Sequence, residues 1–291
     1  MSQKFINKHK VAVLLSTYNG HRYMSELIKS ILSQTYRDFT IYIRDDGSTD
    51  KTRESLEMMS ENNDNIVFFE AGQNIGSKRS FLKMVEFVES AYYMFADQDD
   101  IWMPEKIQKT IDKMLALEKD CPNEAIIVHT DLQLVDGDLR TIASSYWEYC
   151  NIPVDMPHKF EMLCHFNDIT GCAMMFNHKA KELSEPYLYL QLPHHVYHDV
   201  VIGLAVAKNN GIIYPLHEQT ILFRRHGDNE TDPLKKNESI LHHLSRSVVY
   251  LRKQYQRYLF YNQFGYGSFI KFMYYKLLTK RNQNKWKQKY V

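Results

Sequence analysis

The stretch Tyr92-Tyr93-Met94-Phe95-Ala96-Asp97-Gln98-Asp99-Asp100 joins a short apolar run to three carboxylates. The apolar run predicts a buried strand, and its carboxyl end is where open α/β sheets bind ligands. Residues two apart in extended chain point to one side, so Asp97 and Asp99 are expected to face one ligand and Asp100 to face away. A divalent cation carrying phosphate would relieve their mutual repulsion. The acids alone fit a solvated, helix-capping turn equally well.

Strand and helix patterns alternate over roughly the first 120 residues, which predicts a mostly parallel sheet with helices on both faces. The predicted strands span 11–15, 39–43, 66–69 and 92–96, and the predicted helices span 23–34, a segment ending near 62, and 80–90, with Pro104 opening a fourth helix. Polar loops follow the four strands at 16–19, 45–48, 74–79 and 97–100, so we expect one site at that sheet edge.

The pattern changes beyond residue 120. Apolar runs predict further strands at 125–129, 132–135 and 169–176, and two short ones at 212–214 and 220–223. The run 200–207, which follows His198-Asp199, predicts a helix. A basic, aromatic segment from Ser239 to Val291 follows and is also expected to be helical. The chain therefore divides into a main domain, 1–238, and an appendage, 239–291.

The net charge of +1 over 291 residues combines two unlike parts. The segment 239–291 holds 11 of the 36 Lys and Arg residues and no acid, which leaves 25 basic and 35 acidic residues, or −10, in the rest. The four cysteines form no C-x-x-C pair and indicate a reducing compartment, with neither a disulfide framework nor a zinc site. No secretory signal or spanning helix is visible, so we expect a cytoplasmic protein.

Two of the polar loops have both a structural and a functional interpretation. The loop Asp45-Asp46-Gly47-Ser48 has glycine for a tight turn and polar side chains that cap a helix, but its carboxylates also suit a nucleotide base. The loop 74–79 carries Lys78 and Arg79, two cations suited to an anionic nucleotide or to an ordinary surface loop. Taken singly, each loop favours the structural interpretation.

Taken together, the polar segments resemble a family 2 glycosyltransferase with the Rossmann-like GT-A fold. The resemblance rests on the order and spacing of five segments between about Val11 and Asn229: 16–19, 45–48, 74–76, 97–100 and 198–199. No single motif is specific, but the ordered set is. The amino-acid sequence of 95–102, Phe-Ala-Asp-Gln-Asp-Asp-Ile-Trp, is most similar to that of bacterial rhamnosyltransferase-like members.

The resemblance implies roles for individual residues. Asp97 matches an acid near the ribose and diphosphate, and Asp99 matches the metal-binding acid of a D-x-D motif. His226 matches a histidine that closes over the metal, although a lone histidine is more often structural. The positions that match the base and ribose site are Ser16, Tyr18, Asp46 and Arg79.

The resemblance also implies a mechanism. A divalent metal, Mn²⁺ or Mg²⁺, would neutralise the diphosphate leaving group of a nucleotide sugar. Asp199 matches the catalytic base that would deprotonate the acceptor hydroxyl, in one inverting displacement, although the family more often has Glu-Asp where this chain has His198-Asp199. A helix beginning after Asp199 is expected to lower its pKa.

The basic segment 239–291 holds 13 aromatic residues. Basic amphipathic helices with aromatics are typical of membrane-surface elements, and each cation near anionic lipid contributes about 1 kcal/mol. Alternatively, the segment packs on the acidic body or forms a homodimer contact; nucleic acid is less favoured, since no binding module accompanies the charge. Helical spacing relates Phe269, Phe272, Met273, Lys276 and Leu277.

The sequence therefore predicts an inverting, metal-dependent glycosyltransferase that moves a sugar from dTDP-rhamnose or a UDP-hexose to a cell-surface glycan or its lipid-linked precursor. It would act in the cytoplasm, peripherally on the inner membrane face. One alternative is a sugar-phosphate nucleotidyltransferase, but the loop 16–20 has one glycine and no lysine to hold a triphosphate. The other is a non-catalytic glycan- or membrane-docking module, which the retained acids at 97, 99 and 199 disfavour.

Overall fold

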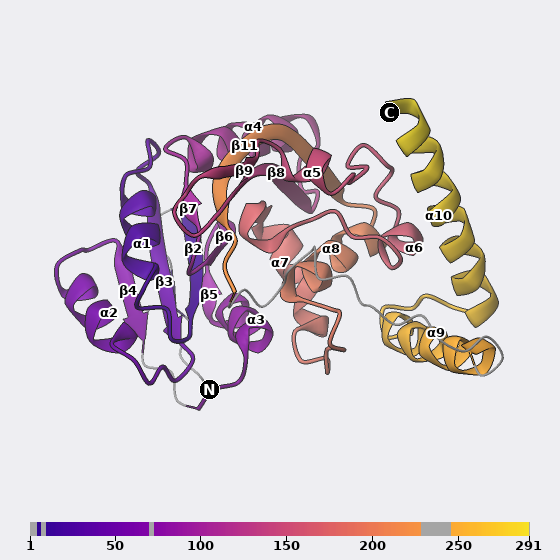
Figure 1. Ribbon diagram of the computed structural model, residues 1–291, viewed down its shortest axis with the longest axis horizontal. Helices are drawn as coiled ribbons and strands as arrows, with labels where there is room; N and C mark the ends of the chain where they lie inside the picture. The colour runs from indigo at the N-terminus through magenta and orange to yellow at the C-terminus, as the bar shows by residue number, and fades with distance from the viewer. Residues whose placement is uncertain (1–4, 7–9, 70–72, 228–245, 291) are drawn as a thin grey trace.

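The computed structural model (Figure 1) describes residues 5–6, 10–69, 73–227 and 246–290. Within this part of the chain, a nine-stranded mixed sheet has the order β4-β3-β2-β6-β10-β8-β11-β7, with β9 paired to β8. The first four of these strands are parallel: β2 (Val11–Thr17), β3 (Phe39–Asp45), β4 (Ile66–Phe69) and β6 (Tyr92–Asp97). The predicted parallel arrangement and strand ranges are confirmed here to within two residues.

The second half of the sheet is mixed. β10 (Met174–Asn177) lies antiparallel between β6 and β8 (Ile126–Val135), and β11 (Ile212–Arg224) runs parallel to β8. Two short strands complete it, β7 (Ile101–Trp102) against β11 and β9 (Thr141–Ala143) against β8. A separate pair joins β1 (Phe5–Ile6) to β5 (Val88–Glu89).

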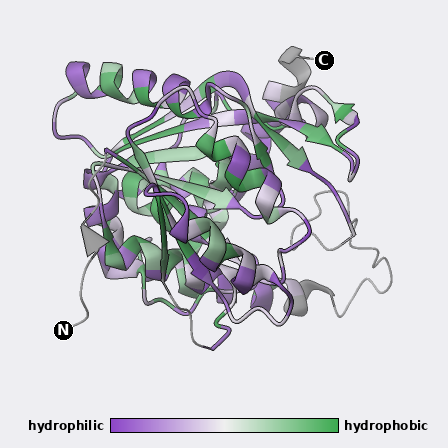
Figure 2. Ribbon diagram, turned by 90° about the vertical axis from the view of Figure 1, so that its left-hand side faces the viewer, coloured by the Kyte–Doolittle hydropathy of each residue, from purple (hydrophilic) through white to green (hydrophobic). Residues whose placement is uncertain are grey.

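Alternate residues of β2 divide between two hydrophobic layers. Val11, Val13 and Leu15 pack with α1 (Met24–Leu32), α2 (Thr52–Glu61) and α4 (Lys106–Asp120). Ala12 and Leu14 face the opposite layer, with α3 (Ser77–Phe87), α7 (His178–Ser184) and α8 (His198–Lys208). Figure 2 shows the resulting apolar strands between the helices.

Several predicted boundaries were wrong, each for an identifiable physical reason. The runs 125–129 and 132–135 belong to one strand, β8, and 212–214 and 220–223 belong to one strand, β11, because the two strands pair across their polar centres. Thr130 Oγ1 and Thr220 Oγ1, 2.7 Å apart, satisfy each other there. The run 169–176 is a strand only from Met174, after the 3-10 turn η1 (Gly171–Ala173).

Three predicted helix boundaries also moved. The fourth helix begins at Lys106 rather than at Pro104, whose carbonyl oxygen accepts a hydrogen bond from the Thr35 amide. The helix predicted for 80–90 starts at Ser77 and ends at Phe87, because Val88 is extended and pairs with β1. Short helices α5 (Tyr146–Tyr149) and α6 (Phe160–Leu163) and the 3-10 turn η2 (Glu185–Tyr187) were not predicted.

The C-terminal segment forms two helices, α9 (Arg246–Asn262) and α10 (Phe269–Tyr290). Phe260 of α9, Phe272 of α10 and Phe264 of the connection between them are buried and share a hydrophobic cluster with Phe160 of α6. Lys271 Nζ lies 2.7 Å from Glu161 Oε1. The aromatic side of the segment therefore belongs to the core of the main body, as the alternative of packing on that body required. The expected boundary at 238/239 lies outside the described residues, as does Asn229.

Among the described helices, none has an apolar stretch of the length and hydropathy needed to cross a bilayer.

Candidate active site

A cavity of about 1190 Å³ opens at the carboxyl ends of β2, β3 and β6. Strand register brings these ends level, since Thr17 pairs with Asp45 and Ser16 with Asp97. This volume exceeds the roughly 300–1,000 Å³ of pockets that bind drug-sized ligands. The residues predicted for the site that line it are Ser16, Tyr18, Asp46, Asp97, Asp99, Asp199 and His226.

The three acids of 97–100 divide as predicted, but not through alternation along a strand, because β6 ends at Asp97, residues 98 and 99 form a turn, and Gln98 lines the cavity as well. Asp97 and Asp99 line the cavity, whereas Asp100 is only 1% exposed. Asp100 accepts a hydrogen bond from the Arg224 backbone amide at 3.3 Å. Burial, followed by repulsion from Asp99 and Asp97, raises the pKa of Asp100 well above its ordinary value. Asp100 therefore stabilises the loop through its buried hydrogen bond and does not face the cavity.

A buried lysine lies beneath this acidic loop. Lys106 is fully buried, its Nζ donates to the carbonyl oxygen of Cys172 at 2.9 Å, and it lies 4.6 Å from the ring centre of Trp102. Burial lowers the pKa of Lys106 to about 8, although the nearby Asp100 and Asp97 act in the opposite direction. Lys106 thus provides a positive charge that offsets part of the repulsion between the acids. This role was not predicted from the sequence, because a lysine at the start of a helix has no distinguishing feature.

Asp99 and His226, separated by 127 positions in the chain, meet in the cavity wall. His226 Nε2 lies 2.8 Å from Asp99 Oδ2, and its ring stacks on Tyr23 with centroids 5.0 Å apart. Arg224 fixes this arrangement, because its Nε donates to the Asp99 carbonyl oxygen at 3.0 Å and its guanidinium lies 4.5 Å from the centre of the Tyr23 ring.

The chemistry of this donor set fits a divalent cation. A carboxylate suits Mg²⁺ and Mn²⁺, and an imidazole extends the preference toward transition metals. Asp99 and His226 supply one donor of each kind, and Asp97 lines the same cavity. Two protein ligands with phosphate oxygens and water are the usual environment of a metal that arrives with its nucleotide.

Two residues predicted to bind the nucleotide, Asp46 and Ser16, also border the cavity. Asp46 is buried, lies 2.6 Å from Arg44 Nη1, and accepts hydrogen bonds from the amides of Ile75 and Gly76 at 2.9 and 2.7 Å. Ser16 Oγ donates to Ser80 Oγ at 2.6 Å. Asp46 therefore fastens the loop 74–76 to the strand edge, and both side chains border the cavity.

Lys78 and Arg79 do not border this cavity. Arg79 donates to the carbonyl oxygens of Leu188 and Tyr189 at 2.7 and 3.0 Å, and Lys78 contacts the carbonyls of Pro193 and His194. These cations hold the 188–194 segment against α3 through its backbone carbonyls. The role predicted for Arg79 at the nucleotide receives no support from this placement.

Asp199 lies at the start of α8 and borders the same cavity as Asp99. Burial raises its pKa to about 6, and hydrogen bonds from the Val200 and Gly171 amides only partly oppose this. The expectation that the helix terminus would lower the pKa was therefore wrong, because the loss of solvation outweighs the amide dipoles. A carboxylate with this pKa is a stronger base than an ordinary aspartate and is still ionised near neutral pH.

His198 is buried in an aromatic pocket beside Asp199. Its ring stacks on Phe81 with centroids 4.2 Å apart and meets Phe95 edge-on at 4.5 Å. Burial lowers the pKa of His198 to about 3, so the ring is neutral. Gly171 is required here, because a β-carbon at that position would lie 2.8 Å from His198 Nε2.

Gln98 is a further contributor that sequence reasoning missed. Its side-chain amide bonds both backbone groups of Tyr18, accepting from the amide at 2.9 Å and donating to the carbonyl oxygen at 3.0 Å. It thereby ties the acidic loop after β6 to the polar loop after β2. Its position between Asp97 and Asp99 was the available signal.

The sheet with its acidic cavity has the GT-A architecture of glycosyltransferases. A model of glycosyl transferase family 2 matches residues 12–182, more than half of the chain, and the chain therefore belongs to that family. The predicted fold class and the prediction of a glycosyltransferase are confirmed at the level of the family.

The individual proteins that resemble this chain match only part of it or have low sequence identity to it. The chain is 32% identical over 120 residues to the dTDP-rhamnosyl transferase RfbG of Shigella flexneri, covering 40% of this chain and 42% of that protein. The structure of S. aureus TarS 1–349 with UDP-GlcNAc matches with a TM-score of 0.55 and 16% identity, covering 76% of this chain and 60% of that one. A Pyrobaculum calidifontis mannosyltransferase, in complex with GDP-Man and Mn²⁺, matches with a TM-score of 0.50 and 17% identity, covering 72% and 55%. The chain thus spans about two fifths of RfbG, and the solved structures support the fold alone.

Proposed function

We propose that this protein is an inverting, metal-dependent glycosyltransferase that uses a nucleotide-diphosphate sugar. The observation that carries the proposal is that one cavity is bordered both by the Asp99–His226 pair and by Asp199. The Asp99–His226 pair suits a cation bound to a diphosphate, and the Asp199 carboxylate suits a base at an acceptor hydroxyl. Family membership supports glycosyl transfer over nucleotidyl transfer.

Each wall of the cavity would have its own task. Ser16, Tyr18 and Asp46 would border the base and ribose, and Asp97 the ribose and diphosphate. Asp99 and His226 would hold Mn²⁺ or Mg²⁺, which supplies charge stabilisation for the diphosphate that leaves.

Asp199 would accept the proton of the acceptor hydroxyl as that oxygen attacks the anomeric carbon. The C–O bond to the nucleoside diphosphate breaks as the new C–O bond forms, with one inversion of configuration. Neutral His198, held by Phe81 and Phe95, would keep the surroundings of the base apolar and sustain its raised pKa.

The donor is expected to be dTDP-rhamnose or a UDP-hexose, and the acceptor a growing cell-surface glycan or its lipid-linked precursor. The similarity to a protein named dTDP-rhamnosyl transferase supports the first donor, and the UDP-GlcNAc complex of TarS supports the second.

A thermal-shift panel of dTDP, UDP and GDP, with and without Mn²⁺, tests the proposal on the whole chain. At about 100 times its Kd, a nucleotide adds about 2.7 kcal/mol, which corresponds to a Tm increase of about 5 °C for a protein of this size. We expect this increase for dTDP or UDP with Mn²⁺, and a much smaller one without metal. Absence of any shift with all three nucleotides would count against donor binding.

A transfer assay separates the proposal from its alternatives. Release of nucleoside diphosphate from the nucleotide sugar in the presence of Mn²⁺ is the expected result. Release of pyrophosphate from a sugar 1-phosphate and a nucleoside triphosphate would instead identify a nucleotidyltransferase. Donor binding with neither product would identify a non-catalytic module.

We also propose that α10 attaches the protein to an anionic membrane surface. Ile270, Tyr274 and Leu277 are 82%, 60% and 68% exposed and share one helical face. The exposed cations of the same helix include Lys280, Arg281 and Lys285. Apolar side chains flanked by cations are typical of interfacial helices, and the absence of acids in this segment removes opposing charge. A homodimer contact through this face is the competing interpretation.

Vesicle flotation with the double variant Ile270→Ser/Leu277→Ser tests the attachment. Truncating the segment would expose the core, because Phe260 and Phe272 are buried in it, so point variants are preferable. We expect at least about tenfold weaker binding to phosphatidylserine vesicles, since each aliphatic side chain contributes about 1.5 kcal/mol or more when fully buried.

Leu115→Ser, at a 43% exposed position of α4, is the matched control and should float like the wild type. Raising the salt concentration should weaken wild-type binding, because the cations contribute. A wild-type protein that fails to float, or a double variant that floats equally well, contradicts membrane attachment. A dimer that the double variant dissociates would support the competing interpretation.

A further inference from the structure

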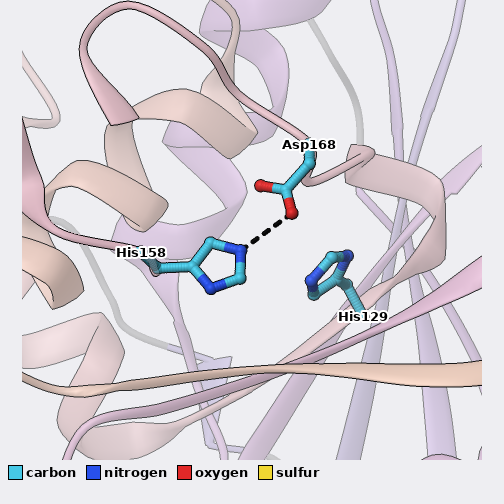
Figure 3. A group of neighbouring side chains, drawn as sticks. All are labelled: His129, His158 and Asp168. Atoms are coloured by element: carbon cyan, nitrogen blue, oxygen red, sulfur yellow. Dashed lines mark hydrogen bonds and ion pairs between the residues drawn. The ribbon is translucent and has the colours of Figure 1, made fainter. Parts of the chain in front are cut away.

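Three metal-ligating side chains meet outside the cavity described above (Figure 3). His129 comes from β8, His158 from the loop before α6, and Asp168 from the segment that follows α6. One ligand atom from each lies within 4.8 Å of the others. None of the three borders the cavity that contains Asp99 and Asp199.

His129 has no polar partner that explains its burial. It is 0% exposed, and neither of its ring nitrogens has a hydrogen-bond partner among the described residues. Its nearest rings are those of Trp147 and His158, with centroids 5.5 and 5.8 Å away, both edge-on. An unsatisfied buried polar group destabilises the folded protein, so a ligand that binds this ring would remove that cost.

The other two residues complete a donor set for a transition metal. His158 Nε2 lies 2.8 Å from Asp168 Oδ2, and Asp168 is 4% exposed. Figure 3 shows the His129 ring beside this pair. Two imidazoles and one carboxylate are the ligand types of catalytic and structural Zn²⁺ sites, and full burial favours the neutral imidazole that coordinates.

The distances are close to those that an ion requires. Zn–N and Zn–O bonds of about 2.0–2.2 Å in a tetrahedron separate ligand atoms by about 3.3–3.6 Å. The His158–Asp168 pair would open slightly from 2.8 Å, and a ligand atom of His129 already lies within 4.8 Å of both. A small cavity of about 10 Å³ borders His158 and Asp168, and its size admits about one water molecule as a fourth ligand.

We propose that His129, His158 and Asp168 form a second metal site, specific for Zn²⁺ or a similar divalent transition metal. The ion would fasten the segments on both sides of α6 to the centre of β8. Asp168 lies two positions before Thr170, which with Gly171 forms part of the large cavity wall next to Asp199. Three protein ligands and a water are the ligand count of an open zinc site, but because the site lies outside the large cavity, the ion would act by bracing that wall.

Metal analysis of the full-length chain tests the site. The background variant Asp99→Asn/His226→Gln removes two candidate ligands of the large cavity, and the cluster variants in that background then show whether the remaining zinc is held by His129, His158 and Asp168. After incubation with Zn²⁺ and desalting, we expect about one equivalent of zinc by mass spectrometry, and a zinc-dependent rise in Tm. Co²⁺ added to the chelator-treated protein should give the intense visible absorption of a tetrahedral site.

His129→Gln and Asp168→Asn, made in that background, should lose at least about tenfold in zinc affinity. His217→Gln is the matched control, because His217 pairs with Asp155 at 3.0 Å and lies beside the same Trp147, yet is outside the cluster. It should keep the zinc. If the two cluster variants fail to fold, the Co²⁺ spectrum of the background protein decides whether a tetrahedral metal site is present. A background protein that retains no zinc and gives no tetrahedral spectrum, or cluster variants that bind zinc normally, would overturn the site.

Discussion

Replacing Asp199 with asparagine is expected to lower kcat for sugar transfer by about 10³-fold while leaving nucleotide affinity within about threefold. Asparagine has nearly the same shape, so the cavity and the start of α8 should be retained, but its amide cannot accept the acceptor proton. General-base catalysis typically contributes 10²–10⁴-fold. Steady-state transfer kinetics and nucleotide titration measure the two quantities separately.

Asp138→Asn is the matched control for this substitution. Asp138 is 73% exposed and pairs with Arg140 on the surface, where such pairs contribute about 0–1 kcal/mol. Its variant should transfer sugar at the wild-type rate. If Asp199→Asn keeps near wild-type transfer together with normal donor binding, Asp199 is not the base.

The pH profile adds a signature that a purely structural role would not produce. Because burial raises the pKa of Asp199 to about 6, wild-type kcat/KM should be level above that pH and fall about tenfold per pH unit below it. The sign follows from the protonated carboxyl being unable to accept a proton. Asp199→Asn should lack this acidic limb, and an unchanged limb in the variant would assign it to another group.

The parallel half of the sheet was predictable because its strands are continuous apolar runs ended by polar loops. Buried strands such as β2 and β6 need no side-chain partners from distant sequence to be recognised. The mixed half of the sheet was not predictable in this way, since β8 continues through Thr130 and Asp131, whose polar side chains interrupt the apolar run. Pairing with β11 satisfies that backbone, and only the tertiary structure reveals the pairing.

In the candidate site, too, features that depend on nearby sequence were predicted and features that depend on tertiary structure were not. The division of Asp97 and Asp99 from Asp100 was predicted from an extended chain, whereas the structure achieves it with a turn at residues 98 and 99, and the family resemblance brought His226 into consideration. The pKa of Asp199 could not be predicted, because a helix terminus is visible in sequence and the burial that outweighs it is not. Arg79 was assigned through the family resemblance, but in the structure its guanidinium donates to the carbonyl oxygens of Leu188 and Tyr189.

Asp99→Asn is expected to weaken Mn²⁺ binding in the presence of nucleoside diphosphate by at least about tenfold and to reduce transfer by about 10²-fold or more. The substitution removes the negative charge that faces His226 Nε2 at 2.8 Å, and it leaves one imidazole and Asp97 for a cation. Because the amide remains a hydrogen-bond acceptor, Tyr23 and His226 should keep their stacking. Calorimetric titration of Mn²⁺ into the nucleotide complex, followed by transfer assays at saturating metal, measures both effects.

Asp100→Asn provides a matched comparison one residue away. Asp100 is 1% exposed, does not border the cavity, and has a raised pKa owing to burial and to repulsion from Asp99 and Asp97. Removing its charge relieves repulsion and preserves an acceptor for the Arg224 amide, so Mn²⁺ affinity should change by less than about threefold. Equal losses in both variants would mean that the loop acts through its overall charge. A loss confined to Asp100→Asn would reverse the assignment of the two acids, because the assignment rests on Asp99 bordering the cavity while Asp100 is buried beside it.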